Sequence, residues 1–271
     1  MTDRELVLRA MVDAARAAAK VVIAIYAEED VGVELKGPND PVTRADREAN
    51  AILLDRLTRS LPGVPIVAEE SDPSAYRGFE ASREALFVDP VDGTREFIAK
   101  NGEFAVMIGF AEEGAATVGI VLAPAQGKTH AGIVGAGAFL IGEDDSRTPI
   151  RVSSATDFTE ARCAVSRFHR SKSVDAKLAK LGVKELVPVG SAGLKGVRVA
   201  EGALEIYAHP SGGDVKLWDA AAPDAIVRAA GGILTDATGR PFDYRGAYKQ
   251  GAGTLAANPT LHAEALRRFA S

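Results

Sequence analysis

The chain has 271 residues, of which 46% are hydrophobic and 25% are charged, and its formal net charge is −5. This length is enough for one large domain or two modest lobes with a substantial core, and the composition is that of an ordinary globular protein. The acidic balance gives no basic surface for a nucleic-acid polymer, although a few local cations still allow a single nucleotide as substrate.

The sequence contains one cysteine, Cys163, so no disulfide can form within the chain and nothing ties the protein to an oxidising compartment. Cys163 lies in an apolar run, which favours a buried small side chain over a reactive thiol. No stretch approaches the ~20 apolar residues that a membrane-spanning helix needs, and the charged start lacks the pattern of a signal peptide. We therefore expect a cytoplasmic protein without a membrane span.

Two helices are predicted at the start of the chain. A capping-box pattern, Thr2-x-x-Glu5, precedes apolar residues that recur at helical spacing over 6–25. A turn-rich link then leads to a second helix, which is expected to run from Thr43 to about Leu61, where a Pro-Gly pair ends it.

Two buried strands and a meander are predicted next. Apolar runs at residues 65–68 and 85–88 are each followed by acidic residues, so both strands are expected to end in carboxylates. After residue 103, strand-like segments alternate with Gly, Pro and acidic turns, which is typical of an antiparallel meander. These segments are residues 104–111, 116–123, 128–134 and 138–141.

The second half alternates strands and helices. The predicted strands are residues 161–166, 186–189, 204–208 and 232–235. The predicted helices are residues 174–181, 194–201 and 219–230, and a final helix that Asn258 caps and that reaches Phe269. A composition change near residue 150 predicts an N-terminal α+β lobe (1–150) and a C-terminal α/β lobe (151–271), built as layers of helices and strands.

The segment Asp-Pro-Val-Asp-Gly-Thr at residues 89–94 is the strongest candidate for a functional site. A buried strand delivers Asp89 to its C-terminal end, where open sheets bind ligands, and Asp92 can face the same space. Gly93 and Thr94 can open a helix, whose free N–H groups favour an anion such as phosphate. Two carboxylates beside an anion need a cation between them, and oxygen ligands favour magnesium, manganese or calcium. The four histidines are scattered, which argues against zinc.

An ordinary acidic turn is the alternative interpretation of residues 89–94. Three other features favour a site instead. Glu69 follows the preceding strand, Asp46 lies one turn after a hydroxyl residue at a helix start, and Asp219 opens a helix far along the chain. Each is unremarkable alone, since Asp46 could be a simple cap and the neighbouring Trp218 a core residue.

Taken together, these motifs resemble the inositol monophosphatase superfamily of lithium-sensitive, magnesium-dependent phosphatases. They occur in the family's order, and the similarity extends from the first helix to residue 232. The resemblance implies a layered α/β/α/β/α sandwich of the inositol monophosphatase and fructose-1,6-bisphosphatase type. Superfamily members are often dimers, so a homodimer is compatible with it. The motifs are Asp40-Pro41-Val42-Thr43-x-x-Asp46, Glu69-Glu70, Asp89-Pro90-Val91-Asp92-Gly93-Thr94 and Trp218-Asp219-x-Ala221.

Within the superfamily, the chain is most similar to the CysQ-type 3'(2'),5'-bisphosphate nucleotidases. The implied substrate is 3'-phosphoadenosine 5'-phosphate, a by-product of sulfate activation and transfer, and the products are AMP and phosphate. Phe168 and His209 depart from that group's pattern, which leaves inositol 1-phosphate, histidinol phosphate or another sugar phosphate as alternatives. The stretches that carry the similarity are residues 95–104, 119–124, 166–169 and 190–195.

The resemblance also implies a metal site with two or three magnesium ions. Glu69, Asp89 and the Val91 carbonyl would hold one ion. Asp89, Asp92 and Asp219 would hold a second, so that Asp89 bridges the two. Glu70 is the alternative to Glu69 as ligand.

The remaining roles follow from the same resemblance. Thr94, hydrogen-bonded to Asp46, would orient and deprotonate the attacking water together with Glu69. Lys195 could instead be a surface lysine, and residues 166–169 a capped loop. The implied substrate-binding residues are Gly93, Thr94, Ser166, Arg167, His169, Ser191, Lys195 and Asp219.

Overall fold

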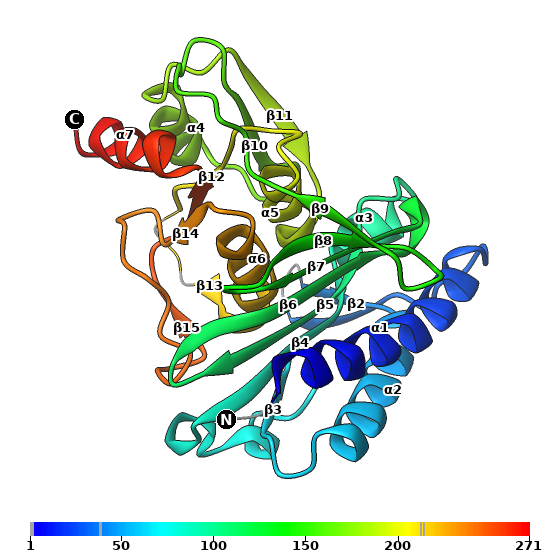
Figure 1. Ribbon diagram of the computed structural model, residues 1–271. Helices are drawn as coiled ribbons and strands as arrows, with labels where there is room; N and C mark the ends of the chain where they lie inside the picture. Colours follow the sequence, from blue (N-terminus) through cyan, green and yellow to red (C-terminus); the bar gives the residue numbers. More distant parts are fainter. Residues whose placement is uncertain (1–2, 38–39, 212, 214) are drawn as a thin grey trace.

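The computed structural model describes residues 3–37, 40–211, 213 and 215–271. The elements stack in five alternating layers of helices and sheets (Figure 1). Three buried hydrophobic clusters hold these layers together. One lies between the first helix layer and the larger sheet, one fills the space around the central helices between the two sheets, and one lies between the second sheet and the outer helices. The predicted α/β/α/β/α sandwich is therefore confirmed.

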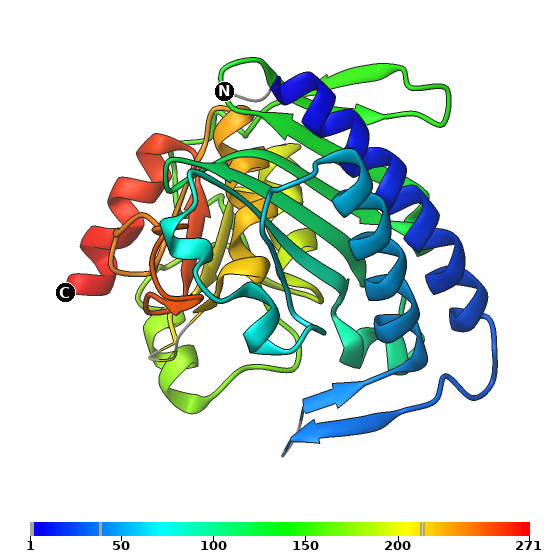
Figure 2. The ribbon, with the colours of Figure 1, turned by 90° about the horizontal axis from the view of Figure 1, so that it is seen from below.

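The first layer consists of α1 (Arg4–Tyr26) and α2 (Arg44–Ser60). Figure 2 shows the two helices side by side across one face of the larger sheet. Asp3 caps α1, because its side chain accepts a hydrogen bond from the Glu5 N–H at 2.9 Å. Thr2, the predicted cap, lies outside the described residues.

A short hairpin joins these helices where the sequence predicted only a turn-rich link. Its strands, β1 (Glu34–Gly37) and β2 (Asp40–Val42), pair in antiparallel fashion. Two residues of the predicted turn, Pro38 and Asn39, lie outside the described residues. The hairpin carries Asp40 and Pro41 to the rim of the cavity described below.

The larger sheet has seven strands in the order β3-β4-β5-β6-β7-β8-β9. Strands β3 and β4 are parallel, and every later neighbour is antiparallel, so the predicted meander is confirmed and gains one strand, β9. The strands are β3 (Ile66–Ala68), β4 (Glu84–Asp92), β5 (Ala105–Glu112), β6 (Ala115–Ala123), β7 (Lys128–Ile133), β8 (Gly137–Ile141) and β9 (Arg147–Ile150).

The second sheet has five strands in the order β11-β10-β12-β16-β14. A separate pair, β13 and β15, lies beside the start of α6. The strands are β10 (Arg162–Ser166), β11 (Glu185–Val189), β12 (Ile206–His209), β13 (Val215–Lys216), β14 (Ile233–Thr235), β15 (Lys249–Gln250) and β16 (Thr254–Ala257). Short 3-10 turns occur at Pro73–Tyr76, Phe79–Ala81 and Pro124–Gln126.

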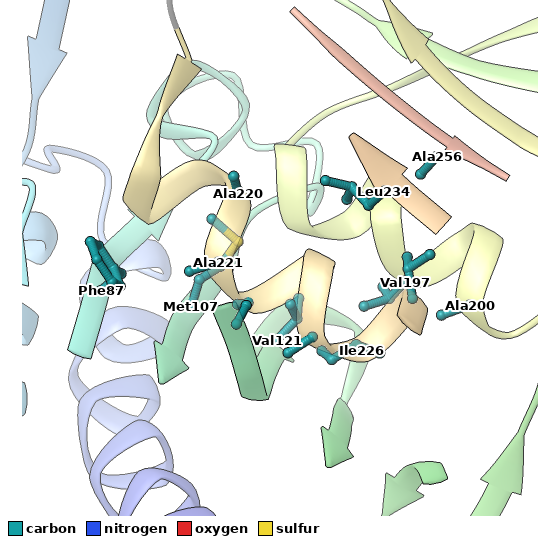
Figure 3. Packing of buried hydrophobic residues seen from close by; sticks show 14 of the residues in the cluster. Phe87, Met107, Val121, Val197, Ala200, Ala220, Ala221, Ile226, Leu234 and Ala256 are labelled. Carbon is teal, nitrogen blue, oxygen red and sulfur yellow. The ribbon is translucent and has the colours of Figure 1, made fainter. Parts of the chain in front are cut away.

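Helices α5 (Ala192–Ala200) and α6 (Leu217–Ala229) fill the layer between the sheets. In Figure 3, Met107 and Val121 of the larger sheet lie against Ala221 and Ile226 of α6. The outer layer holds α4 (Lys172–Ala179) and α7 (Pro259–Ala270). Among the described residues, no helix has the length and apolar character needed to cross a membrane.

Three glycines of the larger sheet explain how closely α6 approaches it. A Cβ at Gly132 would lie 2.8 Å from Ile226 Cα, and a Cβ at Gly109 or Gly119 would overlap the α6 backbone. Because α6 belongs to the second half of the chain, the two halves pack in direct contact here. The division into lobes near residue 150 stays a prediction.

Cys163 is fully buried on β10, as its apolar surroundings predicted. Burial raises the pKa of its thiol to about 12, so the thiol is not a nucleophile at neutral pH.

Candidate active site

A cavity of about 380 Å³ lies where the ends of several elements meet. The C-terminal ends of β3 and β4 form one wall, and the N-termini of α3 (Thr94–Ile98), α5 and α6 form others. The predicted site residues that line it are Glu69, Asp89, Val91, Asp92, Gly93, Thr94, Ser166, His169, Ser191, Lys195 and Asp219. Of the predicted residues that the structure describes, Asp46 and Arg167 are not part of the lining.

Three carboxylates form a compact group in this cavity. One ligand oxygen from each of Glu69, Asp89 and Asp219 lies within 4.8 Å of the others. Glu69 follows β3, Asp89 lies near the end of β4, and Asp219 is in the first turn of α6. The structure therefore brings together carboxylates from positions as far apart in the sequence as Glu69 and Asp219.

The group is electrostatically unfavourable without a cation. Burial, followed by the charge of Glu69, raises the pKa of both Asp89 and Asp219 well above the usual range. Their donor atoms are carboxylate oxygens, which suit a hard divalent cation such as magnesium. The residues present therefore fit the metal that the sequence motifs imply.

Two lysines contact the same group, and the sequence analysis identified neither. Lys216 Nζ donates to Glu69 Oε1 at 2.9 Å, and Lys36 Nζ lies 3.6 Å from that oxygen and also bonds to Glu70. Burial would raise the pKa of Glu69, but the charges of Lys216 and Lys36 outweigh it and lower that pKa. The only sequence signal was position, because Lys216 lies two residues before the Trp218-Asp219 motif in α6.

Asp92 makes a different set of contacts from the other motif carboxylates. It accepts hydrogen bonds from the Ser191 hydroxyl, from Ala192 N at 3.1 Å and from Gly193 N at 2.7 Å. These are the free donors at the start of α5, so Asp92 caps that helix from across the chain. Asp92 lies in the cavity wall, but outside the group of three carboxylates.

The predicted hydrogen bond between Thr94 and Asp46 is present. Thr94 Oγ1 lies 3.2 Å from Asp46 Oδ1 and equally far from the Val91 carbonyl oxygen. Asp46 is held by Thr43, whose N–H and hydroxyl both bond to Asp46 Oδ2, at 2.8 and 2.6 Å. Burial raises the pKa of Asp46, and the bonds from Thr43 oppose that rise.

Gly93 shapes the start of α3, as the sequence predicted. Its φ of +95° lies in the left-handed region, and a Cβ there would stand 2.9 Å from the Glu103 carbonyl oxygen. Glycine at this position therefore permits the sharp turn from Asp92 into Thr94.

Three of the candidate substrate residues, Lys195, Arg167 and His169, make hydrogen bonds or ion pairs within the protein. Lys195 is buried under the cavity, where its Nζ donates to the Ser191 carbonyl at 2.5 Å, so it is not a surface lysine. Arg167 forms an ion pair with Glu103 at 2.7 Å. The His169 N–H donates to Ser166 Oγ at 3.1 Å, which is the capped loop that the sequence allowed as an alternative.

The sequence profile of the inositol monophosphatase family matches residues 3–270. The chain belongs to this family. CysQ of Shigella flexneri, a 3'(2'),5'-bisphosphate nucleotidase, is 34% identical over 85% of this chain and 90% of its own. The SuhB structure from Bartonella henselae covers 97% of this chain and 98% of its own, with a TM-score of 0.84 and 27% identity. The CysQ structure from Bacteroides thetaiotaomicron covers 93% of this chain and 96% of its own, with a TM-score of 0.76 and 26% identity.

Membership of the inositol monophosphatase family confirms the resemblance inferred from the ordered motifs. It leaves the individual site residues as predictions. Several cavity residues lie outside the motifs that identified the family, and the sequence analysis did not predict their place in the site. They are Arg95, Tyr207, Lys216 and Thr254.

His209, which departs from the nucleotidase pattern, also lines the cavity. Burial, together with the charge of Lys195, lowers the pKa of His209 to about 4, so its imidazole is neutral at physiological pH. It therefore offers hydrogen bonds without a positive charge.

Proposed function

We propose that this chain is a magnesium-dependent 3'(2'),5'-bisphosphate nucleotidase that hydrolyses 3'-phosphoadenosine 5'-phosphate to AMP and phosphate. The observation that carries the chemistry is the group of Glu69, Asp89 and Asp219 at the wall of the cavity that the sequence motifs line. The similarity to CysQ proteins over most of both chains supports the choice of substrate.

Glu69, Asp89 and Asp219 would hold the metal, with Asp92 and the Val91 carbonyl as further candidates beside them. Magnesium bound there would acidify a water molecule and neutralise charge that develops on the leaving oxygen. Glu69 and Asp89 lie at the ends of neighbouring strands of the larger sheet and Asp219 lies in α6 of the central helix layer, so the folded chain holds them in place before any metal binds.

Thr94 and Asp46 would orient the attacking water. When the Thr94 hydroxyl donates to Asp46, its oxygen lone pairs can accept a hydrogen bond from water in the cavity. Asp46 is fixed by two bonds from Thr43, so the Thr94 hydroxyl has a defined direction. Glu69 would take the water proton, as the sequence motifs imply.

The substrate phosphate would lie against the start of α3. The Gly93 and Thr94 N–H groups lie at the first turn of that helix, where backbone donors suit phosphate oxygens. Lys195 adds a positive charge beneath the cavity, and Ser166, His169 and Ser191 would contact the rest of the substrate. Arg167 could take part only after leaving Glu103.

The ion pair between Arg167 and Glu103 favours a second candidate function, a phosphatase for inositol 1-phosphate or a related sugar phosphate. A bisphosphate needs cations for two phosphate groups. With Arg167 engaged, the described cations that line the cavity are Arg95, Lys195 and Lys216. Lys216 is itself bound to Glu69, which leaves less positive charge for a second phosphate.

A substrate panel with purified protein in magnesium would test the proposal. We expect kcat/KM for 3'-phosphoadenosine 5'-phosphate to exceed the values for inositol 1-phosphate and histidinol phosphate by at least about tenfold, because a second phosphate adds charged contacts. A preference for either monophosphate would overturn the nucleotidase assignment and favour the second candidate. A cytoplasmic location and a homodimer stay predictions.

A further inference from the structure

Lys216 is the residue just before α6, and its side chain reaches the group of Glu69, Asp89 and Asp219. Its backbone is fixed, because it pairs with Lys249 on β15 and the next residue, Leu217, donates its N–H to the Tyr248 carbonyl at 2.9 Å. Its side chain is about one-third exposed, at 34%, and its Nζ reaches Glu69 Oε1 at 2.9 Å. The side chain can therefore move into solvent while the backbone stays in place.

We propose that Lys216 is a built-in cation of this site, which neutralises Glu69 when no metal is bound and competes with a magnesium ion for that carboxylate. This inference deepens the proposed function and rests on its assignment of Glu69 as a metal ligand. It assigns to Lys216 a role in setting how tightly the site holds its metal.

The charges around Lys216 support this role. Glu69, Asp89 and Asp219 lie close enough together to repel one another strongly when buried. The Lys216 ammonium group, hydrogen-bonded to Glu69, relieves part of that repulsion in the metal-free protein. A divalent ion bound to the same carboxylate would repel the ammonium, so the two cations oppose each other at Glu69.

Other groups near Glu69 do not replace this contact. Lys36 lies farther from the same oxygen, at 3.6 Å, and its own hydrogen bond goes to Glu70. Lys249 is the cross-strand partner of Lys216, and its Nζ lies over the Tyr248 ring at 5.5 Å. Lys249→Met therefore removes the same charge from the same strand pair without touching Glu69, which makes it a matched control.

The position of Lys216 also provides a spectroscopic signal. Its Nζ lies 5.5 Å from the centre of the Trp218 ring, and Trp218 is the only tryptophan of the chain. That ring stacks on Tyr248 and is almost completely buried. Movement of the ammonium away from the ring changes its local field, so Trp218 fluorescence should report displacement of Lys216.

The test is a magnesium titration of the metal-free full chain without substrate, followed by calorimetry and by Trp218 fluorescence. We expect Lys216→Met to bind magnesium at least about tenfold more tightly than the wild type. Its melting temperature in EDTA should fall, and magnesium should restore it. Lys249→Met should match the wild type in affinity, and only proteins that retain Lys216 should show the fluorescence change of the displaced ammonium.

Two results would overturn the inference: an affinity of Lys216→Met equal to or weaker than that of the wild type, or the same gain in Lys249→Met. If Lys216→Met does not fold even with magnesium, Lys216→Gln is measured in its place, and the same criteria apply to it. A wild-type chain that binds no magnesium would refute the metal assignment of the proposed function as well. Tight wild-type binding with no gain in the variant would refute only the role of Lys216.

Discussion

Asp92→Asn separates the structural role of Asp92 from its proposed catalytic role. The sequence motifs alone predict that this change abolishes metal-dependent phosphate release and leaves the fold intact. In the structure, the Asp92 carboxylate also accepts three hydrogen bonds from Ser191, Ala192 and Gly193 at the start of α5. The variant should therefore lose stability as well as activity.

The size of the loss follows from those bonds. An asparagine side chain keeps one acceptor oxygen and turns an N–H₂ group toward N–H and O–H donors, so at least one of the three bonds is lost. A hydrogen bond to a charged group contributes about 1.5–3 kcal/mol. We therefore expect the free energy of unfolding of Asp92→Asn to be about 2 kcal/mol lower than that of the wild type.

Asp89→Asn is the matched control, three residues away in the same motif. It accepts a hydrogen bond from the Val91 N–H at 3.0 Å, and an amide oxygen can also accept this bond. Burial and the charge of Glu69 already raise the pKa of Asp89, so a neutral side chain relieves repulsion in the metal-free protein. Asp89→Asn should lose activity but keep or gain stability.

Urea unfolding of both variants in EDTA, with a parallel phosphate-release assay in magnesium, would measure the difference. The structure predicts that the two variants share the loss of activity and differ in stability. If Asp92→Asn were as stable as the wild type, or Asp89→Asn the less stable of the two, the capping role of Asp92 would be refuted.

Three further predictions concern other parts of the molecule. Thr94→Ala should lower kcat by about 10²–10⁴-fold with little change in the melting temperature, whereas Thr94→Ser should keep most activity; equal rates for the two variants would contradict the role of the hydroxyl. Gly132→Ala should cost about 1–3 kcal/mol in urea unfolding, because its Cβ would lie 2.8 Å from Ile226 Cα. Burial raises the pKa of Asp224 from 3.8 to about 7, so the folded state holds a proton that the unfolded state has lost. The free energy of unfolding of the wild type should therefore fall as the pH rises from about 4 to about 7, and Asp224→Asn should remove that fall. A variant with the same pH profile as the wild type would rule this out.

The sequence predicted much of the fold because its signals are local. Apolar runs followed by carboxylates predicted β3 and β4, and the Gly-Thr pair after Asp92 predicted the start of α3. Ordered motifs then identified the inositol monophosphatase family, and the family supplied the order of the layers.

What the sequence missed depends on contacts between distant segments. Strand β9 has an exposed, mostly polar sequence, and its place at the sheet edge comes only from pairing with β8. The cap that Asp92 provides for α5 joins residues about a hundred positions apart. Lys216 lies next to a recognised motif, but only the folded chain brings its side chain to Glu69. Spacing along the chain carries no information about such contacts.

The most direct test of the account is phosphate release from 3'-phosphoadenosine 5'-phosphate by the wild type and by Asp219→Asn, each with magnesium and with EDTA. Asp219 is the one member of the carboxylate group that comes from the second half of the chain. The account predicts release by the wild type only with magnesium, and a loss of at least about 10³-fold in a folded Asp219→Asn protein, because a metal ligand is removed. Undiminished release by Asp219→Asn, or wild-type activity in EDTA, would contradict it.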